Sequence, residues 1–271
     1  MLFVRRNPVK CIFKNYEGGL KLNLESIRWE LKKLLTFPIP EIMIISIIFN
    51  GTIILPSVVL LLSTFYSPTG SFLIYNFVQY ILHLVTYYTF MIQGIALGVV
   101  ATIVFAYECE TGILDMELVY SQNRTKLFMS KLVALILIGI AYFFTSTLVL
   151  IIYNLRGSWL IESFYSLLSL GIPPLIQIIF IISLNVLISV VSEKTVISIL
   201  SSALTFYSLD NLLRYSNPQP GSLLYSIPPV CTSASILLQD MPVGNLLTAL
   251  IISLGFLLIA YIYFARFYEV K

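Results

Sequence analysis

Residues 42–107 begin IMIISIIFNGTIILPSVVLLL, end MIQGIALGVVATIVFAY, and contain no Asp, Glu, Lys or Arg. A core helix or strand of a soluble protein is far shorter than this uncharged stretch. The bias extends along the 271-residue chain, which is 58% hydrophobic and 11% charged, whereas an average soluble domain has roughly 25% charged residues. The sequence therefore predicts an all-α integral membrane protein.

Six transmembrane helices are predicted from the uncharged apolar runs, because one span needs about 20 such residues. They lie at about 42–65, 77–105, 132–153, 168–191, 195–213 and 246–265. The transmembrane domain then covers residues 42–265, which leaves no room for a large soluble domain.

The positions of Lys and Arg predict which side each end occupies, since these residues are retained in short cytoplasmic segments. With six spans, 14 of the 16 basic residues fall on one face, and only Arg156 and Arg214 fall opposite. We therefore expect a multi-pass protein of the cell (plasma) membrane with both termini cytoplasmic (N-in, C-in). Residues 1–41 form its cytoplasmic N-terminal segment and residues 266–271 its tail.

An amphipathic helix is predicted at about 20–35, before the first span. Apolar residues recur there at helical spacing and basic residues occupy another face, while Trp29 suits the membrane interface. The helix is either a mechanical element or a simple interfacial anchor. Its apolar positions are Leu20, Leu24, Ile27, Leu31, Leu34 and Leu35.

The cytoplasmic connection at about 106–131 has an acidic first half and a basic second half. Ile113, Met116 and Tyr120 form a short apolar stripe at helical spacing, to which a partner could bind. The alternative is a solvated helical hairpin whose charges only secure topology.

The outer connection at about 213–245 is rich in proline, but residues 222–227 and 230–238 are too apolar for free solution. They predict short extracellular helices or a re-entrant hairpin between spans five and six. An ordinary folded loop is the alternative.

Catalytic and metal-binding motifs are absent from the sequence. It has one histidine, three cysteines without short spacing, no H-E-x-x-H, no G-x-S-x-G and no Gly-Lys dipeptide of a phosphate-binding loop. We expect no enzyme activity and no cofactor in this chain, and no nucleic-acid partner. Proton-coupled secondary transport is disfavoured because no charged residue lies clearly at the bilayer midplane.

The order of parts, and one loop pattern, resemble the type-2 ABC-transporter permease family. The pattern runs over about 24 residues between spans two and three, with Gln122 where the family has proline. Its positions here are Glu108, Gly112, Leu118, Ser121, Arg124 and Lys131.

This resemblance implies a permease subunit that pairs with a second permease, the same or a homologous chain, in contact with membrane lipids. Two cytosolic ABC ATPase subunits would bind ATP and Mg and drive alternating access, most often for export. The resemblance makes the loop the ATPase-coupling element, with Glu108 able to pair with the ATPase or with Arg28, Lys32 or Lys33. Gly112 would let helices cross closely or break the span before the loop helix. The alternatives are a boundary role for Glu108 and a plain turn at Gly112. The coupling candidates are Glu108, Glu110, Gly112, Ile113, Met116, Tyr120 and Arg124.

The resemblance also places the second and fifth spans along a substrate cavity. The aromatic, largely uncharged spans favour a hydrophobic or amphipathic cargo such as a lipid, drug or peptide. The same residues could instead only pack, and the chain could be a non-transporting scaffold or an immunity factor derived from a permease. The cavity candidates are Tyr87, Phe90, Gln93, Ser198, Ser202 and Thr205.

Three predictions concern polar and small residues inside the spans. Asn50, Gln93, Gln177 and Asn185 should not face lipid, and a hydrogen bond between helices is the usual alternative to cavity lining. The Gly94–Gly98 spacing permits close helix approach, either within the chain or in a dimer. The i,i+4 spacing of Asp210 and Arg214 predicts an ion pair at a helix end.

Overall fold

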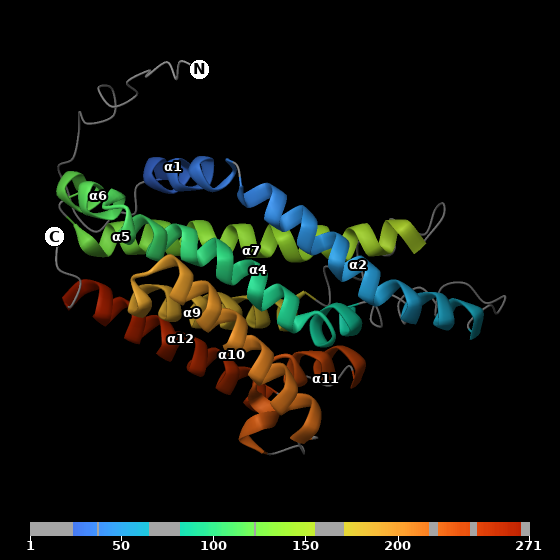
Figure 1. Ribbon diagram of the computed structural model, residues 1–271. Coiled ribbons are helices and arrows are strands. Elements are labelled where there is room, and N and C mark those ends of the chain that lie inside the picture. The colour runs from blue at the N-terminus through green and yellow to red at the C-terminus, as the bar shows by residue number, and fades with distance from the viewer. Residues whose placement is uncertain are drawn as a thin grey trace, which may run out of the picture.

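The computed structural model describes residues 24–36, 38–64, 82–121, 123–154, 171–216, 222–238 and 243–266. These residues form helices joined by short turns, and no strand occurs among them (Figure 1). The long helices run side by side in one bundle, with a short helix, α1 (Leu24–Leu34), along its edge. The all-α fold is as the sequence predicts.

Five candidate spans are long and apolar enough to cross a membrane, counted over the described residues. One is continuous through α4 (Phe90–Thr102), the π-helical segment η1 (Ile103–Tyr107) and α5 (Glu108–Glu110). The chain is thus a multi-pass membrane protein. The other four are α7 (Arg124–Asn154), α9 (Ile172–Ser192), α10 (Thr195–Ser216) and α12 (Val243–Arg266).

The first predicted span corresponds to α2 (Ile39–Thr64). Among the described residues, its part Ile39–Thr52 meets the same length and hydropathy requirement when it is joined to α1, from which it is bent by 64°. The two helices are separated by Pro38, which disfavours helical backbone in the residue before it. A sixth span, and the side of the membrane on which the termini lie, stay predictions.

Helix α9 is the centre of the bundle and packs against α4, α7, α10, α11 and α12. It begins with Pro173 and Pro174 in its first turn, where a missing N–H leaves no helical bond unmade. It ends at Glu193, whose left-handed backbone (φ 52°) turns the chain directly into α10. This tight turn makes α9 and α10 antiparallel neighbours.

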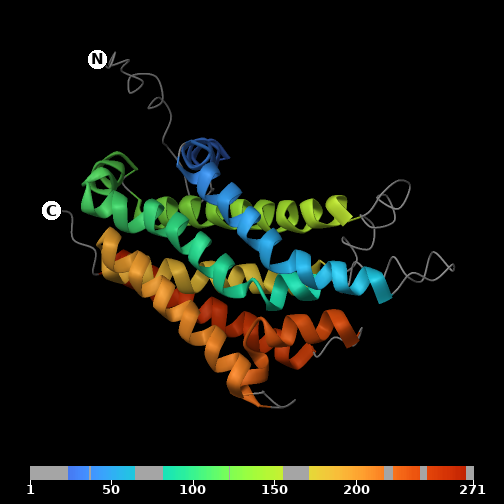
Figure 2. The ribbon, with the colours of Figure 1, turned by 45° about the vertical axis from the view of Figure 1, so that its right-hand side comes forward.

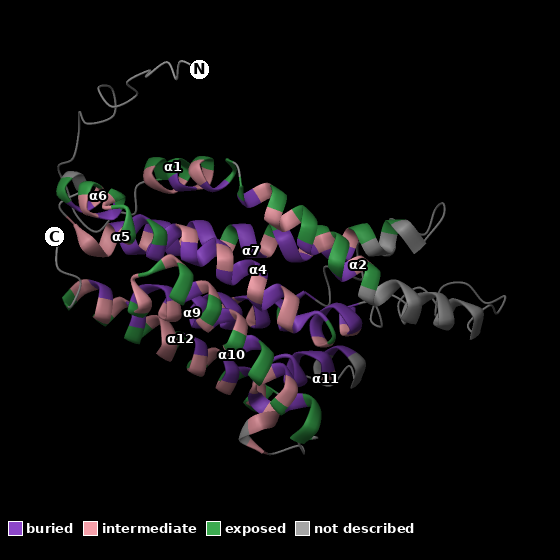
Figure 3. Ribbon diagram, in the orientation of Figure 1, coloured by how far each residue is buried: buried purple, intermediate pink, exposed green. Residues whose placement is uncertain are grey.

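Helices α10 and α12 lie at the edge of the bundle, where Figure 3 shows exposed residues along them, and many of these residues are apolar. In a membrane protein such exposed faces contact lipid, which is as apolar as leucine. The described helices therefore bury polar side chains inside and leave aliphatic ones outside. The exposed aliphatic residues include Leu200, Leu204, Ile251, Leu254, Leu258 and Ile259.

The connection that the sequence predicts to be extracellular contains a 3₁₀ turn, η2 (Leu223–Ser226), and helix α11 (Val230–Leu238). The prediction of short helices is therefore confirmed. Both pack against α12, and α11 also packs against α9, as the view in Figure 2 shows for α11 and α12. This segment is part of the bundle rather than a free loop.

One end of the bundle gathers α5, α6 (Ile113–Ser121), the beginning of α7, the turn from α9 to α10 and the end of α12 (Figures 1 and 2). Helix α1 lies beside the same end. Most of the described basic residues belong to these segments, so this is the end that the sequence analysis predicts to be cytoplasmic.

Candidate functional site

The connection between α5 and α6 turns at Gly112, whose backbone is left-handed (φ 73°). A glycine adopts this conformation without the steric cost that other residues meet. No heavy atom lies within 4 Å of the position that a Cβ would take. Gly112 therefore ends the span and allows the chain to turn into α6. It is not a point at which two helices cross closely.

Helix α6 has one face buried in the bundle and one face open. Leu114 and Leu118 are buried, whereas Ile113, Met116 and Val119 are 36%, 58% and 64% exposed. We call these three side chains the α6 surface. The sequence analysis predicted Ile113 and Met116 for this surface but missed Val119, which continues their helical spacing. The third predicted residue was Tyr120, whose side chain lies outside the described residues.

Behind the α6 surface lies a buried ionic cluster formed by Glu30 and Lys33 of α1, Glu108 of α5, Glu117 of α6 and Lys131 of α7. The Nζ of Lys131 lies 2.5 Å from Glu108, 2.7 Å from Glu117 and 3.2 Å from Glu30. Lys33 pairs with Glu108 and lies 2.9 Å from Glu117. Four helices are thus joined through two ammonium groups.

The charged groups of the cluster stabilise one another, because an ion removed from water is costly unless opposite charges lie close to it. Lys131 is 0% exposed and Glu108 2%. Burial raises the pKa of the Glu117 carboxyl, but the ammonium groups of Lys131 and Lys33 outweigh burial and hold that pKa below its usual range. Glu117 is therefore ionised at neutral pH, and removal of either cation would strand buried negative charge.

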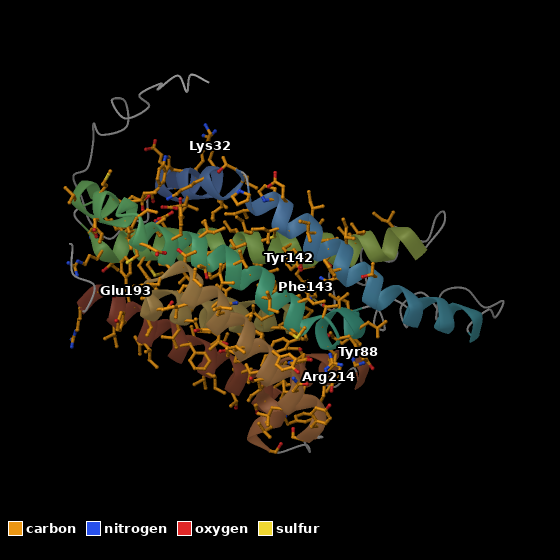
Figure 4. All side chains as sticks on the ribbon, viewed as in Figure 1. Lys32, Tyr88, Tyr142, Phe143, Glu193 and Arg214 are labelled. Carbon is orange, nitrogen blue, oxygen red and sulfur yellow. The ribbon has the colours of Figure 1, made fainter. Side chains whose placement is uncertain are left out.

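Glu108 has one of the predicted partners, Lys33, and a second partner in Lys131. Arg28 and Lys32 are exposed on the other face of α1, and Figure 4 shows Lys32 directed away from the bundle. Because Glu108 is buried inside this chain, any part that it plays in coupling must act through the cluster rather than by direct contact with a partner.

Two further coupling candidates bind the ends of other helices at the same end of the bundle. Glu110 accepts hydrogen bonds from the backbone N–H (2.9 Å) and the hydroxyl (2.6 Å) of Thr195, so it caps the beginning of α10. Arg124 donates from Nη1 to the carbonyl of Ala265 at the end of α12 (3.1 Å). Both residues fasten neighbouring helix ends to the loop that carries α6.

Four cavity candidates lie in the packed contact of α4 with α9 and α10. The ring of Phe90 meets that of Phe206 at 5.5 Å, and the hydroxyl of Ser198 lies 2.7 Å from that of Thr102. Gln93 and Ser202 are 1% exposed. Tyr87 and Thr205 are half-buried, and a cavity role for the six stays a prediction.

Amide and hydroxyl side chains connect the helices inside the bundle, and we call Gln93, Gln177, Asn185 and Thr232 the polar seam. The Nε2 of Gln177 donates to the carbonyl of Thr86 (2.9 Å), and its Oε1 accepts from Thr232 of α11 (2.9 Å). The Nδ2 of Asn185 donates to the carbonyl of Gly94 (3.0 Å). These bonds join α9 to α4, to α11 and to the helical residues 82–87.

The prediction that the polar span residues avoid lipid is confirmed, since Asn50, Gln93, Gln177 and Asn185 are at most 1% exposed. Asn50 of α2 bonds to Tyr142 of α7 (3.1 Å), which lies in the middle of the bundle in Figure 4. Each amide makes a hydrogen bond to another helical segment.

The two glycines of α4, Gly94 and Gly98, pack against other helices of the same chain. A Cβ on Gly94 would lie 2.2 Å from the ring of Phe206, and one on Gly98 would lie 2.8 Å from the Oδ1 of Asn185. The helices α9 and α10 thus approach α4 too closely for a larger residue.

The predicted ion pair of Asp210 and Arg214 is present at 2.8 Å, at the opposite end of the bundle from α6. The guanidinium of Arg214 also lies over the rings of Tyr87 and Tyr88, at 5.7 and 5.4 Å from their centres (Figure 4). These contacts hold the end of α10 against residues 82–89.

In comparisons with known proteins, no family model and no curated protein matches the chain. Among the residues that the structure describes, no three His, Cys, Asp or Glu side chains are placed to hold a metal ion. The α6 surface and the ionic cluster are therefore interpreted from their own chemistry.

Proposed function

We propose that the chain is a permease subunit of an ATP-driven ABC transporter of the type-2 class, and that α6 receives the movement of the ATPase. One observation carries the proposal: an exposed apolar helix lies at the end of a membrane bundle, with a buried ionic cluster directly behind it. Ile113, Met116 and Val119 offer the apolar contact. Glu117 lies on the same helix and pairs with Lys131 and Lys33.

The cluster supports a mechanical role because it links α6 to helices that run through the bundle. A displacement of α6 acts on Lys131 at the beginning of α7, and through Glu108 on the end of the α4–α5 span. The interfacial helix α1 moves with them, since Lys33 and Glu30 belong to the same cluster. Force applied at one surface thus reaches two spans and α1.

In this proposal two ATPase subunits bind ATP and Mg, and a second permease, the same or a homologous chain, completes the pathway. Closure of the ATPases tilts the spans and opens the cavity to alternate sides. The cargo is hydrophobic or amphipathic and its direction is export. The chain itself carries out no covalent chemistry.

Binding and coupling can be tested separately, because they rest on different residues. Met116→Asp and Val119→Asp place a charge on the α6 surface and should weaken capture of the ATPase by at least about tenfold. Tyr215→Asp is the matched control, since it charges an exposed aromatic residue (86%) at the opposite end of the bundle. Capture is measured by co-purification from membranes with matched expression.

Glu108→Gln should leave the α6 surface intact, so the ATPase should still bind while transport in reconstituted vesicles is lost. The charge on Glu108 holds Lys33 and Lys131, and a neutral amide loosens the link from α6 to the spans. Wild-type capture and wild-type transport in all three variants would exclude this loop as the transmission element. Capture of an ATPase without any transport by the unaltered complex would favour the scaffold alternative.

A further inference from the structure

The charges of the ionic cluster do not balance. Three carboxyl groups (Glu30, Glu108 and Glu117) face two ammonium groups (Lys33 and Lys131) among the described side chains. If every group were ionised, the cluster would hold one excess negative charge in a place largely closed to water. Such a charge is expensive in a protein interior, and a carboxyl group in this position takes up a proton instead.

The other charged groups on the elements of the cluster do not offset this excess. On α1, Arg28 and Lys32 point to the exposed face, together with Glu25. The remaining groups stand on the elements packed around it: Asp115 on α6, which adds negative charge, and Arg124 and Lys126 in the first turn of α7, a full turn or more before Lys131. Glu110, the last residue of α5, is exposed and bonds to Thr195 at the beginning of α10.

Glu30 is the least compensated of the three carboxyl groups. Its only salt-bridge contact among the described residues is the longest in the cluster, 3.2 Å from Oε1 to Lys131. Its Oε2 is buried and has no hydrogen-bond partner in the part of the chain that the structure describes. Glu108 and Glu117, by contrast, each contact both ammonium groups.

We propose that Glu30 is a proton-binding site: its carboxyl group holds one proton while α1 is docked against α5, α6 and α7. The docked cluster is then neutral, with two carboxylates and two ammonium groups. When α1 separates and Glu30 meets water, the O–H bond breaks and the proton passes to solvent. Undocking of α1 therefore releases one proton and is favoured by higher pH. This site does not depend on the proposed transport function.

The electrostatic environment agrees with this geometry. Burial raises the pKa of Glu30 above its usual range, and the ammonium groups of Lys131 and Lys33 offset this only in part, while Glu117 and Glu108 raise it further. A folded-state pKa above the unfolded value means that the native chain holds a proton that the unfolded chain has released. The contribution of Glu30 to stability is then fully present below the unfolded pKa and is lost as pH rises to the folded one.

The direct test is infrared spectroscopy of the full chain purified in detergent, without any ATPase. A protonated carboxylic acid has a C=O stretch well separated from the carboxylate bands. We expect such a band in the wild type at a pH where exposed carboxyl groups are ionised, its loss in Glu30→Gln, and its retention in Glu25→Gln, a matched exposed residue of α1. Absence of the band from the wild type would overturn the proposal. So would a band that survives in Glu30→Gln and disappears in Glu108→Gln or Glu117→Gln.

A second measurement distinguishes proton binding from a plain salt bridge by the sign of the effect. Glutamine mimics the protonated acid, so Glu30→Gln should unfold at a higher temperature than the wild type at about pH 8 and match it near pH 4, below the unfolded pKa. Loss of an ordinary ion pair would lower the unfolding temperature at both pH values, which would contradict the proposal. The single histidine, His83, is present in both proteins and cancels in the difference. Should Glu30→Gln fail to accumulate, Glu30→Asp replaces it: the band should shift in frequency with this substitution, and an unshifted band would overturn the proposal.

Discussion

The two buried polar regions of this bundle use different chemistry. The ionic cluster at the end that carries α6 consists of charged side chains, whereas the polar seam farther inside consists of amides and a hydroxyl. A charge is less costly near the membrane surface, and its cost rises steeply toward the bilayer centre. Neutral hydrogen-bonding groups connect helices there at lower cost.

The two regions also differ in what the loss of one member leaves behind. In the ionic cluster, a single atom, the Nζ of Lys131, serves three carboxyl groups on three other elements. In the polar seam the bonds are pairwise, and several end on backbone carbonyls such as those of Thr86 and Gly94. Loss of one residue should therefore destabilise the whole ionic cluster, whereas loss of one residue of the polar seam should remove only the bonds of that residue.

The largest effect is expected from Lys131→Met, which removes the shared cation while keeping a flexible side chain of similar length. The variant should lose about 3–5 kcal/mol of stability, because Lys33 alone then faces the buried carboxylates and one negative charge is left without a cation. Lys32→Met, an exposed lysine of α1, is the control and should be nearly neutral. Reversible unfolding in mixed micelles measures both. A loss in Lys131→Met no greater than in the control would remove the distinction between the two regions.

A smaller loss is expected from Gln177→Leu in the polar seam, which removes bonds to Thr86, Gln93 and Thr232. Hydrogen bonds between membrane helices contribute on average about 0.6 kcal/mol each, so the total should be about 1–2 kcal/mol. The double variant with Gln93→Leu should lose less than the sum of the two single variants, since the two amides share a bond. Additive losses would show that the seam is not a connected network.

The smallest effect is expected from Asp210→Asn at the far end of the bundle. This pair with Arg214 is partly exposed, and such pairs contribute about 0–1 kcal/mol, less at high salt. The unfolding midpoint should shift only slightly and the shift should shrink with added salt. A loss comparable with that of Lys131→Met would mean that exposure does not govern the strength of ion pairs in this fold.

The long helices follow directly from hydropathy, because an uncharged run must be helical to satisfy its backbone in lipid. Hydropathy placed α9 within a few residues, but it began the third span at residue 132, whereas α7 begins at Arg124. The missing turns carry charge and continue the same helix outside the apolar run. A helix end is thus predicted well only where polarity and helicity change at the same residue.

The ionic cluster was only half visible in the sequence. Glu108 was predicted as a functional residue with Lys33 as a possible partner, and Lys131 only as part of the loop pattern. Neither Glu30 nor Glu117 stood out, because their contacts join residues far apart in the chain, such as Lys33 and Glu117. Their burial depends on how α1 packs beside α7, and periodicity within one helix carries no information on that.

The π-helical segment η1 decides which way Glu108 points. A π-helical turn contains one residue more than an α-helical turn, so everything after it is rotated by about 100° relative to a regular helix. With this rotation Tyr107 is exposed and Glu108 is buried. Deletion of one residue from Ile103–Tyr107 would keep the span apolar and nearly as long, yet turn the carboxylate away from Lys131. The direction in which the Glu108 carboxylate points is therefore set by the number of residues in the uncharged segment before it.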